Sequence, residues 1–230
     1  MLKVASYNMR KGIGTDRVRR PDRICDVLCE IGADVVALQE ADRRFGARAA
    51  AIPVEMIARC TPYTHVDFAR RPDSIGWHGN AILVPRESRI DARGHIDIPT
   101  IEPRGAVWAD LELGGGPIRI VAMHLDLSGL RRRQQARAIA EALGRLPVRP
   151  TVLMGDLNEW TLHGGAVSEF AHHYRMAPTG PSFHARRPVA RLDRIMVSPA
   201  LTIEACGVHH SLKSRHASDH LPIWARIVQA

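Results

Sequence analysis

The stretch Thr151-Val152-Leu153-Met154-Gly155-Asp156-Leu157-Asn158 joins an apolar run to two polar side chains. The run Thr151–Met154 is typical of a buried strand, and Asp156 and Asn158 follow shortly after it. Functional side chains gather where strands pass into loops, because the strand fixes the position and the loop is free to vary. A carboxylate at such a point can hold a hard cation or take a proton from water. The stretch therefore predicts a buried sheet with a chemically active edge.

A second pair of polar residues lies near the C-terminus, in Ser218-Asp219-His220, and the apolar run Leu221–Trp224 follows it directly. Metal-assisted phosphoryl chemistry needs carboxylates that hold a cation and an imidazole that meets the developing charge. The two stretches together supply both kinds of group. Three further β-prone runs end in a polar side chain: residues 4–8 in Asn8, 34–40 in Glu40 and 118–124 in His124.

The pattern of apolar residues predicts more strands than helices. Helices are predicted near residues 20–32, 47–60 and 129–145, with a short helix near 166–173 in the loops of 160–189. Strands are predicted near 2–8, 34–40, 64–69, 79–85, 89–97, 104–112, 117–124, 151–155, 191–198, 202–210 and 222–228. Short turns between most neighbours favour mixed sheets covered by helices, which is an α/β or α+β fold. A length of 230 residues suits one domain over residues 1–230.

The chain is strongly basic. It carries 32 lysines and arginines against 24 acidic residues, a net charge of +8, and its sequence pI is about 10.0. This charge favours an anionic partner, which leaves nucleic acid, a phosphorylated metabolite and an anionic lipid as alternatives.

The sequence contains no uncharged apolar stretch of about 18 residues, so no membrane-spanning segment is expected. The chain starts with Met1-Leu2-Lys3-Val4 and enters a predicted strand at once, without the pattern of a signal peptide. A cytoplasmic location is the expectation that follows.

Seven motifs resemble, in order, those of the endonuclease/exonuclease/phosphatase superfamily, which includes DNase I, abasic-site endonucleases and inositol polyphosphate 5-phosphatases. The motifs are Ser6-Tyr7-Asn8, Leu38-Gln39-Glu40, His78-Gly79-Asn80-Ala81-Ile82-Leu83, His124-Leu125, Gly155-Asp156-Leu157-Asn158, Leu192-Asp193-Arg194-Ile195 and Ser218-Asp219-His220. They extend over nearly the whole chain. The resemblance implies a DNase I-like four-layer sandwich, in which two mixed β-sheets pack face to face between helices and the active site lies at one end.

The resemblance also implies a metal site. Glu40, Asn8 and Asp219 correspond to positions that bind Mg²⁺ or Mn²⁺, and hard oxygen ligands of this kind suit Mg²⁺.

Five residues correspond to catalytic positions of the family. Asp156 and Asn158 resemble the pair that orients the attacking water and the phosphate. His220 resembles the residue that stabilises the transition state, and Asp193 the carboxylate that pairs with this histidine and fixes its tautomer. His124 adds a second imidazole, which suits protonation of the leaving oxygen or contact with a phosphoryl oxygen.

Substrate contacts are expected from two further groups. Asn80 and His78 lie in the motif before a predicted strand, where Asn80 can bond the phosphate or Glu40. Arg131, Arg132 and Arg133 open a predicted helix, where cations are unfavourable by about 0.3–1 kcal/mol each. Because they follow His124 by a few residues, we expect them, with Arg104, to attract the substrate phosphate. A solvated basic face is the alternative for the three consecutive arginines.

The prediction from sequence is a Mg²⁺- or Mn²⁺-dependent phosphoesterase that hydrolyses phosphodiester bonds by in-line attack of an activated water. The basic charge places a nuclease first. The short chain and the few aromatic residues leave a phosphodiesterase or phosphatase for a lipid head group or small metabolite as the alternative. A catalytically inactive basic binding module is the third possibility, which the intact set of motifs disfavours.

Overall fold

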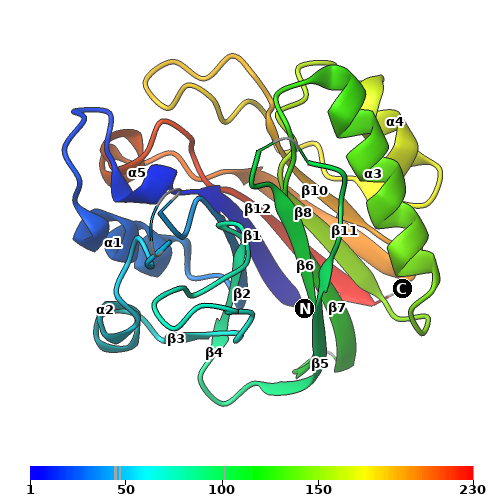
Figure 1. The fold of residues 1–230 in the computed structure, drawn as a ribbon, viewed down its shortest axis with the longest axis horizontal. Helices are drawn as coiled ribbons and strands as arrows, with labels where there is room; N and C mark the ends of the chain where they lie inside the picture. The colour runs from blue at the N-terminus through cyan, green and yellow to red at the C-terminus, as the bar shows by residue number, and fades with distance from the viewer. Residues whose placement is uncertain (44–45, 47, 101, 115, 230) are drawn as a thin grey trace.

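The computed structural model describes residues 1–43, 46, 48–100, 102–114 and 116–229. Two six-stranded mixed sheets pack face to face between helices (Figure 1). The first sheet has the order β11-β12-β1-β2-β4-β3. Its strands are β1 (Leu2–Asn8), β2 (Val35–Gln39), β3 (Tyr63–His65), β4 (Ala81–Pro85), β11 (Leu201–Val208) and β12 (Ile223–Gln229).

The second sheet has the order β5-β6-β7-β8-β10-β9. Its strands are β5 (Arg89–Ile96), β6 (Gly105–Leu113), β7 (Gly116–His124), β8 (Thr151–Asp156), β9 (Arg175–Met176) and β10 (Asp193–Val197). The helices are η1 (Arg10–Gly12, a 3-10 turn), α1 (Pro21–Ile31), α2 (Val54–Cys60), α3 (Gly129–Gly144), α4 (Gly165–Ala171) and α5 (Leu212–Ala217).

The apolar residues form three buried layers. The central layer lies between the sheets and combines residues such as Val4 and Val35 of one sheet with Val107 and Val152 of the other. A second layer packs α1 and α2 on the outer face of the first sheet, and a third packs α3 and α4 on the outer face of the second. Buried apolar area of this kind stabilises a fold by about 25 cal/mol per Å². The predicted α/β (α+β) four-layer sandwich is therefore confirmed.

The register of the strands places the polar strand ends together. In the parallel pair β1–β2, Asn8 lies opposite Gln39, the residue before Glu40. In the parallel pair β7–β8, His124 lies opposite Asp156, and antiparallel β10 brings Asp193 opposite Asp156 from the other side. The polar ends of these strands therefore meet at one end of the sandwich.

Some predicted elements were wrong in extent. Residue 47 of the predicted helix 47–60 lies outside the described residues, and the helix covers only Val54–Cys60. It starts after Pro53, which lacks the N–H that a helix interior needs. The predicted strand 64–69 is reduced to Tyr63–His65, and the sequence pattern missed η1, β9 and α5 because each is too short to show a period.

Within the described ranges, no helix is both long and apolar enough to cross a membrane.

Candidate active site

The Asp156 side chain lies at the centre of the polar cluster. It ends β8 and is 1% exposed. Its Oδ2 accepts a hydrogen bond from Asn8 Nδ2 at 2.9 Å, although the two residues are 148 positions apart in the sequence. The same oxygen lies 3.5 Å from Nε2 of His124 and 3.8 Å from Nε2 of His220. Three predicted site residues, from both sheets and the C-terminal loop, thus converge on one carboxylate oxygen.

Asn158 closes the other side of this carboxylate. Its backbone N–H donates to Asp156 Oδ1 at 2.9 Å, and its side-chain amide donates to the Leu125 carbonyl at 2.9 Å. The residue has a φ of 50°, a left-handed conformation that asparagine tolerates better than most residues. This local turn holds the Asn158 amide next to the ends of β7 and β8.

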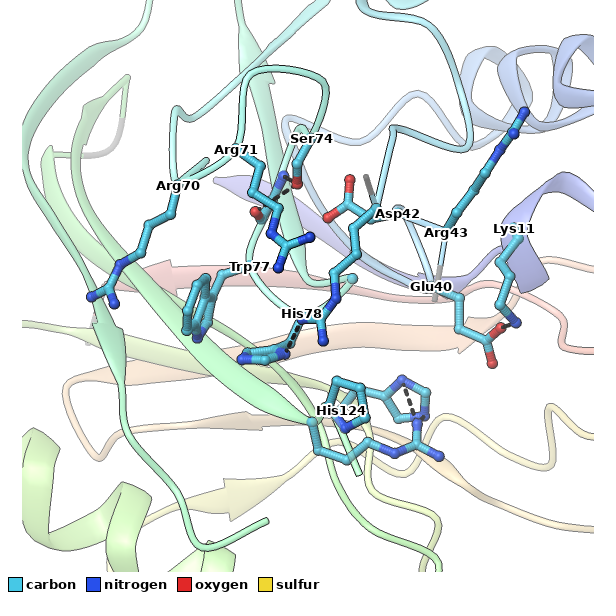
Figure 2. A pocket seen from close by; sticks show the side chains of 15 residues that line it. Lys11, Glu40, Asp42, Arg43, Arg70, Arg71, Ser74, Trp77, His78 and His124 are labelled. Carbon is cyan, nitrogen blue, oxygen red and sulfur yellow. Dashed lines mark hydrogen bonds and ion pairs between the residues drawn. The ribbon is translucent and has the colours of Figure 1, made fainter. Parts of the chain in front are cut away.

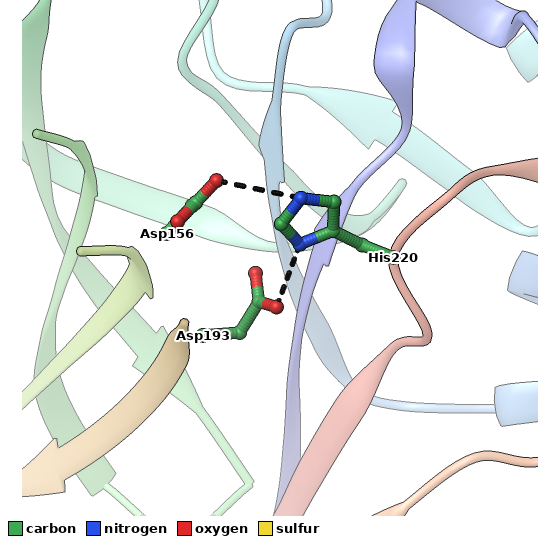
Figure 3. A group of neighbouring side chains, drawn as sticks. All are labelled: Asp156, Asp193 and His220. Atoms are coloured by element: carbon green, nitrogen blue, oxygen red, sulfur yellow. Dashed lines mark hydrogen bonds and ion pairs between the residues drawn. The ribbon is translucent and has the colours of Figure 1, made fainter. Parts of the chain in front are cut away.

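His220 is held between two carboxylates. Its Nδ1 lies 2.8 Å from Asp193 Oδ2, while Nε2 faces Asp156 (Figure 3). Asp193 is fully buried at the start of β10, and the Ser182 hydroxyl donates to the same Asp193 oxygen. The Asp193 carboxylate accepts a hydrogen bond from Nδ1–H and fixes the orientation of the ring, so that Nε2 points into the site.

The two histidines of the cluster carry different charges. Burial opposes the charged form of His220, but Asp193, Asp156 and Asp219 outweigh it and raise its pKa to about 10. Burial lowers the pKa of His124 to about 3, and the Arg104 guanidinium adds to this effect. At neutral pH His220 is therefore a cation that donates hydrogen bonds, whereas His124 is neutral.

The residues of the predicted metal site follow segments that are bonded to the end of β1. The Ser218 hydroxyl donates to the Asn8 carbonyl at 2.7 Å, just before Asp219. The Met9 N–H donates to the Gln39 carbonyl at 3.1 Å, just before Glu40. Asp219 and Glu40 are thereby anchored to the same strand end as Asn8.

Both of these carboxylates face a cation from the turn η1. Arg10 Nε lies 3.2 Å from Asp219 Oδ2, and Lys11 Nζ forms an ion pair with Glu40. The two carboxylates and the Asn8 side-chain oxygen, which accepts the Arg10 N–H at 3.1 Å, offer oxygen donors, and the structure balances the carboxylate charges with positive groups. This donor set fits Mg²⁺ or Mn²⁺. Asp156, Asp193 and His220 form a second group whose ligand atoms lie within 4.8 Å of one another, close enough to hold a metal ion.

Beside the cluster lies a pocket of about 680 Å³, shown in Figure 2. His124 belongs to both the pocket and the catalytic cluster, and Glu40 of the predicted metal site also lines the pocket. Two of the predicted substrate residues, His78 and Arg104, also line it. The remaining lining residues are Lys11, Asp42, Arg43, Arg48, Arg70, Arg71, Ser74, Gly76, Trp77, Gly79 and Pro103.

Asn80 is not among the residues that line this pocket. Its side-chain amide donates to the Gly105 carbonyl at 3.0 Å and so ties the start of β4 to the start of β6. It is fully buried, and its Oδ1 has no hydrogen-bond partner among the described residues. The structure therefore gives Asn80 a contact between the two sheets.

Arg131, Arg132 and Arg133 are not brought together with the other predicted residues. Arg132 is buried against Glu159, with Nε 3.3 Å from Oε2, and Arg133 pairs with Glu169. Arg131 bonds Gln134 on its own helix. Each of the three has a local partner on α3, α4 or the loop between β8 and α4.

Sequence reasoning did not assign four basic residues that lie at the site. Arg10 and Lys11 lie two and three residues after Asn8, so their position after a strand-end motif was a usable signal. Arg48 and Arg71 come from irregular segments, and no period or motif marks them.

Comparisons with known proteins agree with this geometry. The profile of the Endonuclease/Exonuclease/phosphatase family matches residues 5–220. A search of curated proteins found no match. Similar solved structures include an endonuclease/exonuclease/phosphatase from Bacteroides vulgatus, with a TM-score of 0.78, 18% identity and coverage of 100% of this chain and 99% of that chain.

Two further solved structures carry more specific names. A mannosyl-6-phosphatase from Bacteroides thetaiotaomicron VPI-5482 has a TM-score of 0.77 and 21% identity, covering 99% of this chain and 100% of that chain. TDP2 from D. rerio, complexed with a single-strand DNA product, has a TM-score of 0.73 and 18% identity, covering 98% of both chains. Identities this low show a shared fold, and the predicted DNase I-like fold is confirmed.

Proteins of the matched family are hydrolases that act on phosphoester bonds and generally depend on a divalent metal. Because the family profile spans residues 5–220, the chain belongs to the endonuclease/exonuclease/phosphatase family.

Proposed function

We propose that the chain is a divalent-metal-dependent phosphoesterase in which Asp156 activates the attacking water. The observation that carries the proposal is the convergence of Asn8, His124 and His220 on Asp156 Oδ2. A carboxylate that is oriented by several neighbours can take a proton from a water at a defined position, which is the task of a general base.

His220 and Asn158 are suited to the charge that develops on phosphorus. Asp193 occupies Nδ1 of His220, so the N–H at Nε2 is available for a phosphoryl oxygen near Asp156. The backbone N–H of Asn158 lies on the other side of the same carboxylate. Donors that are fixed before the reaction stabilise a transition state without reorganising, and loss of one such donor typically lowers the rate by about 10²–10³-fold.

Glu40, Asn8 and Asp219 are the residues that we propose to hold the metal. When bound there, a divalent cation supplies positive charge to a phosphoryl oxygen and so favours attack on phosphorus. We place it there because Asp193 already occupies Nδ1 of His220, which makes the group Asp156, Asp193 and His220 a proton-handling unit.

Of the two roles that the sequence left open for His124, we propose the second, contact with a phosphoryl oxygen. Its low pKa makes it a poor donor of a full proton to the leaving oxygen at neutral pH. Arg104, which contacts the ring, brings a permanent charge to the same place. We propose that the pair acts through hydrogen bonding and charge.

The substrate has two candidates. The charge of +8 supports nucleic acid, as does the likeness to TDP2, which was solved with a single-strand DNA product. The pocket beside the cluster, which several arginine side chains line, supports a compact phosphorylated molecule, because small ligands bind in concave sites with a few placed polar groups. The likeness to a mannosyl-6-phosphatase agrees with the second candidate.

The test is hydrolysis of bis-p-nitrophenyl phosphate, p-nitrophenyl phosphate and supercoiled plasmid with Mg²⁺ or Mn²⁺, using Asp156→Ala and His220→Ala as controls. Plasmid nicking that both variants lose would establish a nuclease. Turnover of a chromogenic ester without nicking would favour the compact substrate. Failure on all three would contradict a general phosphoesterase and favour the inactive binding module.

A further inference from the structure

The pocket beside the catalytic cluster has an excess of positive charge. Six of its described lining residues are cationic and two are acidic. The two acids are occupied: Glu40 pairs with Lys11, and buried Asp42 accepts the Ile75 N–H at 3.0 Å. Apart from Arg104, whose Nη2 lies 3.7 Å from Glu102 Oε2, the arginines are therefore the groups that remain for a ligand.

None of the described carboxylates forms an ion pair with Arg48, Arg70 or Arg71. Instead these arginines are positioned by neutral groups. Arg48 Nη1 lies 3.1 Å from His78 Nδ1, and Arg71 Nη1 donates to the Gly46 carbonyl at 3.0 Å. Arg70 stacks on the Trp77 ring at 4.6 Å. A guanidinium that is held in place but has no counter-ion is prepared to bind an anion.

His78 supports this arrangement. Burial lowers its pKa, and neighbouring Arg48 lowers it further. The ring is therefore neutral and accepts a hydrogen bond from Arg48, which holds the guanidinium at the pocket wall. In Figure 2, Arg71 and His78 lie on the same side of the pocket, while Arg43 points away from them.

Arg104 connects this pocket to the catalytic cluster. Its Nη1 lies 2.9 Å from His124 Nδ1, and His124 in turn contacts Asp156. Its Nε is buried and has no hydrogen-bond partner among the described residues. An unpaired buried donor is unfavourable, and binding of an anion would supply its missing partner.

We propose that Arg48, Arg71 and Arg104 bind a second phosphate group of a compact substrate whose first phosphate lies at Asp156 and His220. This inference rests on the proposed phosphoesterase activity and specifies its substrate class, a small molecule with two phosphates. The pocket favours a small molecule because its walls come from three separate parts of the chain: Asp42, Arg43 and Arg48, then residues between Arg70 and Gly79, then Pro103 and Arg104. A nucleic-acid strand would need a continuous open groove with stacking aromatic residues, and Trp77 already stacks with Arg70 and His95.

The test compares two sugar phosphates that differ in one phosphate. Fructose 6-phosphate and fructose 1,6-bisphosphate are measured as competitive inhibitors of bis-p-nitrophenyl phosphate hydrolysis with Mn²⁺. In the unsubstituted protein the bisphosphate should inhibit at a concentration about tenfold lower or more, since one charged hydrogen-bonded contact is typically worth that much. In Arg48→Ala and Arg71→Ala the ratio of the two inhibition constants should fall to within about twofold of one.

Arg59→Ala is the matched control, because it removes the same charge from an exposed position on α2 outside the pocket. It should keep the full ratio. A ratio near one in the unsubstituted protein, or a ratio that Arg48→Ala and Arg71→Ala leave unchanged, would overturn the proposal. A single-stranded decamer that competes better than the bisphosphate, and loses this advantage in the same variants, would overturn the compact ligand and identify nucleic acid.

Binding without turnover separates this proposal from the proposed function. Calorimetric titration of the protein with fructose 1,6-bisphosphate in EDTA needs no metal and no hydrolysis. If no ester is hydrolysed but the bisphosphate still binds, and both variants weaken that binding, the subsite stands and the proposed activity fails. If the ester is hydrolysed but the bisphosphate does not bind, the subsite fails alone.

Discussion

Asp193 Oδ2 lies 2.8 Å from His220 Nδ1, and the opposite ring nitrogen of His220 faces Asp156. This relationship makes Asp193 a positioning residue, since it is fully buried behind the histidine. Asp193→Asn should lower kcat by about 10²–10⁴-fold with little change in KM, because the imidazolium loses the carboxylate that orients it and stabilises its charge. Steady-state kinetics on bis-p-nitrophenyl phosphate across pH would measure it. Ser182→Ala, which removes only a donor to Asp193, should have a smaller effect, and a kcat within threefold for Asp193→Asn would contradict the assignment.

The proposed metal site predicts that Mn²⁺ stabilises the protein through Glu40. A ligand at a hundredfold excess over its Kd contributes about 2.7 kcal/mol to the free energy of unfolding. Thermal unfolding in Mn²⁺ against EDTA should therefore show a higher Tm, and Glu40→Gln should abolish the difference. Glu55→Gln on the exposed face of α2 is the control and should keep the shift. An equal shift in both variants would place the metal elsewhere.

Lys11 should weaken metal binding, because it forms an ion pair with Glu40. Lys11→Met frees the carboxylate and removes a cation beside a divalent ion, a repulsion of about 1–2 kcal/mol at separations near 5 Å in water. We expect Mn²⁺ to bind about tenfold more tightly in calorimetric titration. Lys213→Met removes the same charge from an exposed pair on α5 and should leave the affinity unchanged. Weaker binding in Lys11→Met would mean that the lysine supports the site.

The raised pKa of His220 predicts that stability depends on pH. The folded protein holds this proton up to about pH 10, whereas the unfolded chain releases it near pH 6.5. The stabilisation is therefore full below pH 6.5 and is lost as pH rises toward 10. Urea unfolding in EDTA should show the advantage of the unsubstituted protein over His220→Gln shrinking by up to about 2 kcal/mol between pH 7 and pH 9. A difference that does not vary with pH would show that His220 is neutral in the folded state.

A buried ion pair far from the site should dominate the stability of the second sheet. Arg119 contacts both oxygens of Asp110, at 2.7 and 2.8 Å, and both side chains are buried. Asp110→Ala should lower the free energy of unfolding by about 3–5 kcal/mol, because it leaves a buried charge without a partner. Asp67→Ala breaks an exposed pair with Arg93 and should cost less than about 1 kcal/mol. Equal losses in the free energy of unfolding for Asp110→Ala and Asp67→Ala, measured with urea, would contradict this prediction.

The fold class could be predicted from the sequence because long strands and helices carry a clear apolar period, whereas the four-layer sandwich was implied by the family resemblance of the seven motifs. The helix of residues 47–60 shows the limit of this approach, since composition favoured it but Pro53 sets where a helix can begin. The strand-end residues were predictable for a related reason. Asn8 and Asp156 lie far apart in the chain, but both end buried strands, and packing of the two sheets brings those ends together.

The basic residues were harder to predict, since short distance along the chain is no measure of distance in space. Arg132 follows His124 closely in sequence. However, α3 packs against α4 (Figure 1), and Arg132 on α3 forms an ion pair with Glu159. Arg48 and Arg71 approach the site through irregular segments whose path depends on many weak contacts. A single sequence contains no pattern that encodes such a path.

The active site is divided between the two halves of the sandwich. Asn8 and Glu40 extend from the first sheet and Asp156 and Asp193 from the second, while the central layer that joins the halves is apolar and non-directional. A small sliding of one sheet over the other would separate Asn8 from Asp156 while every strand kept its own hydrogen bonds. Catalysis should therefore depend on the alignment of the two sheets more strongly than the strands themselves do. On heating, turnover should disappear while circular dichroism still reports intact strands.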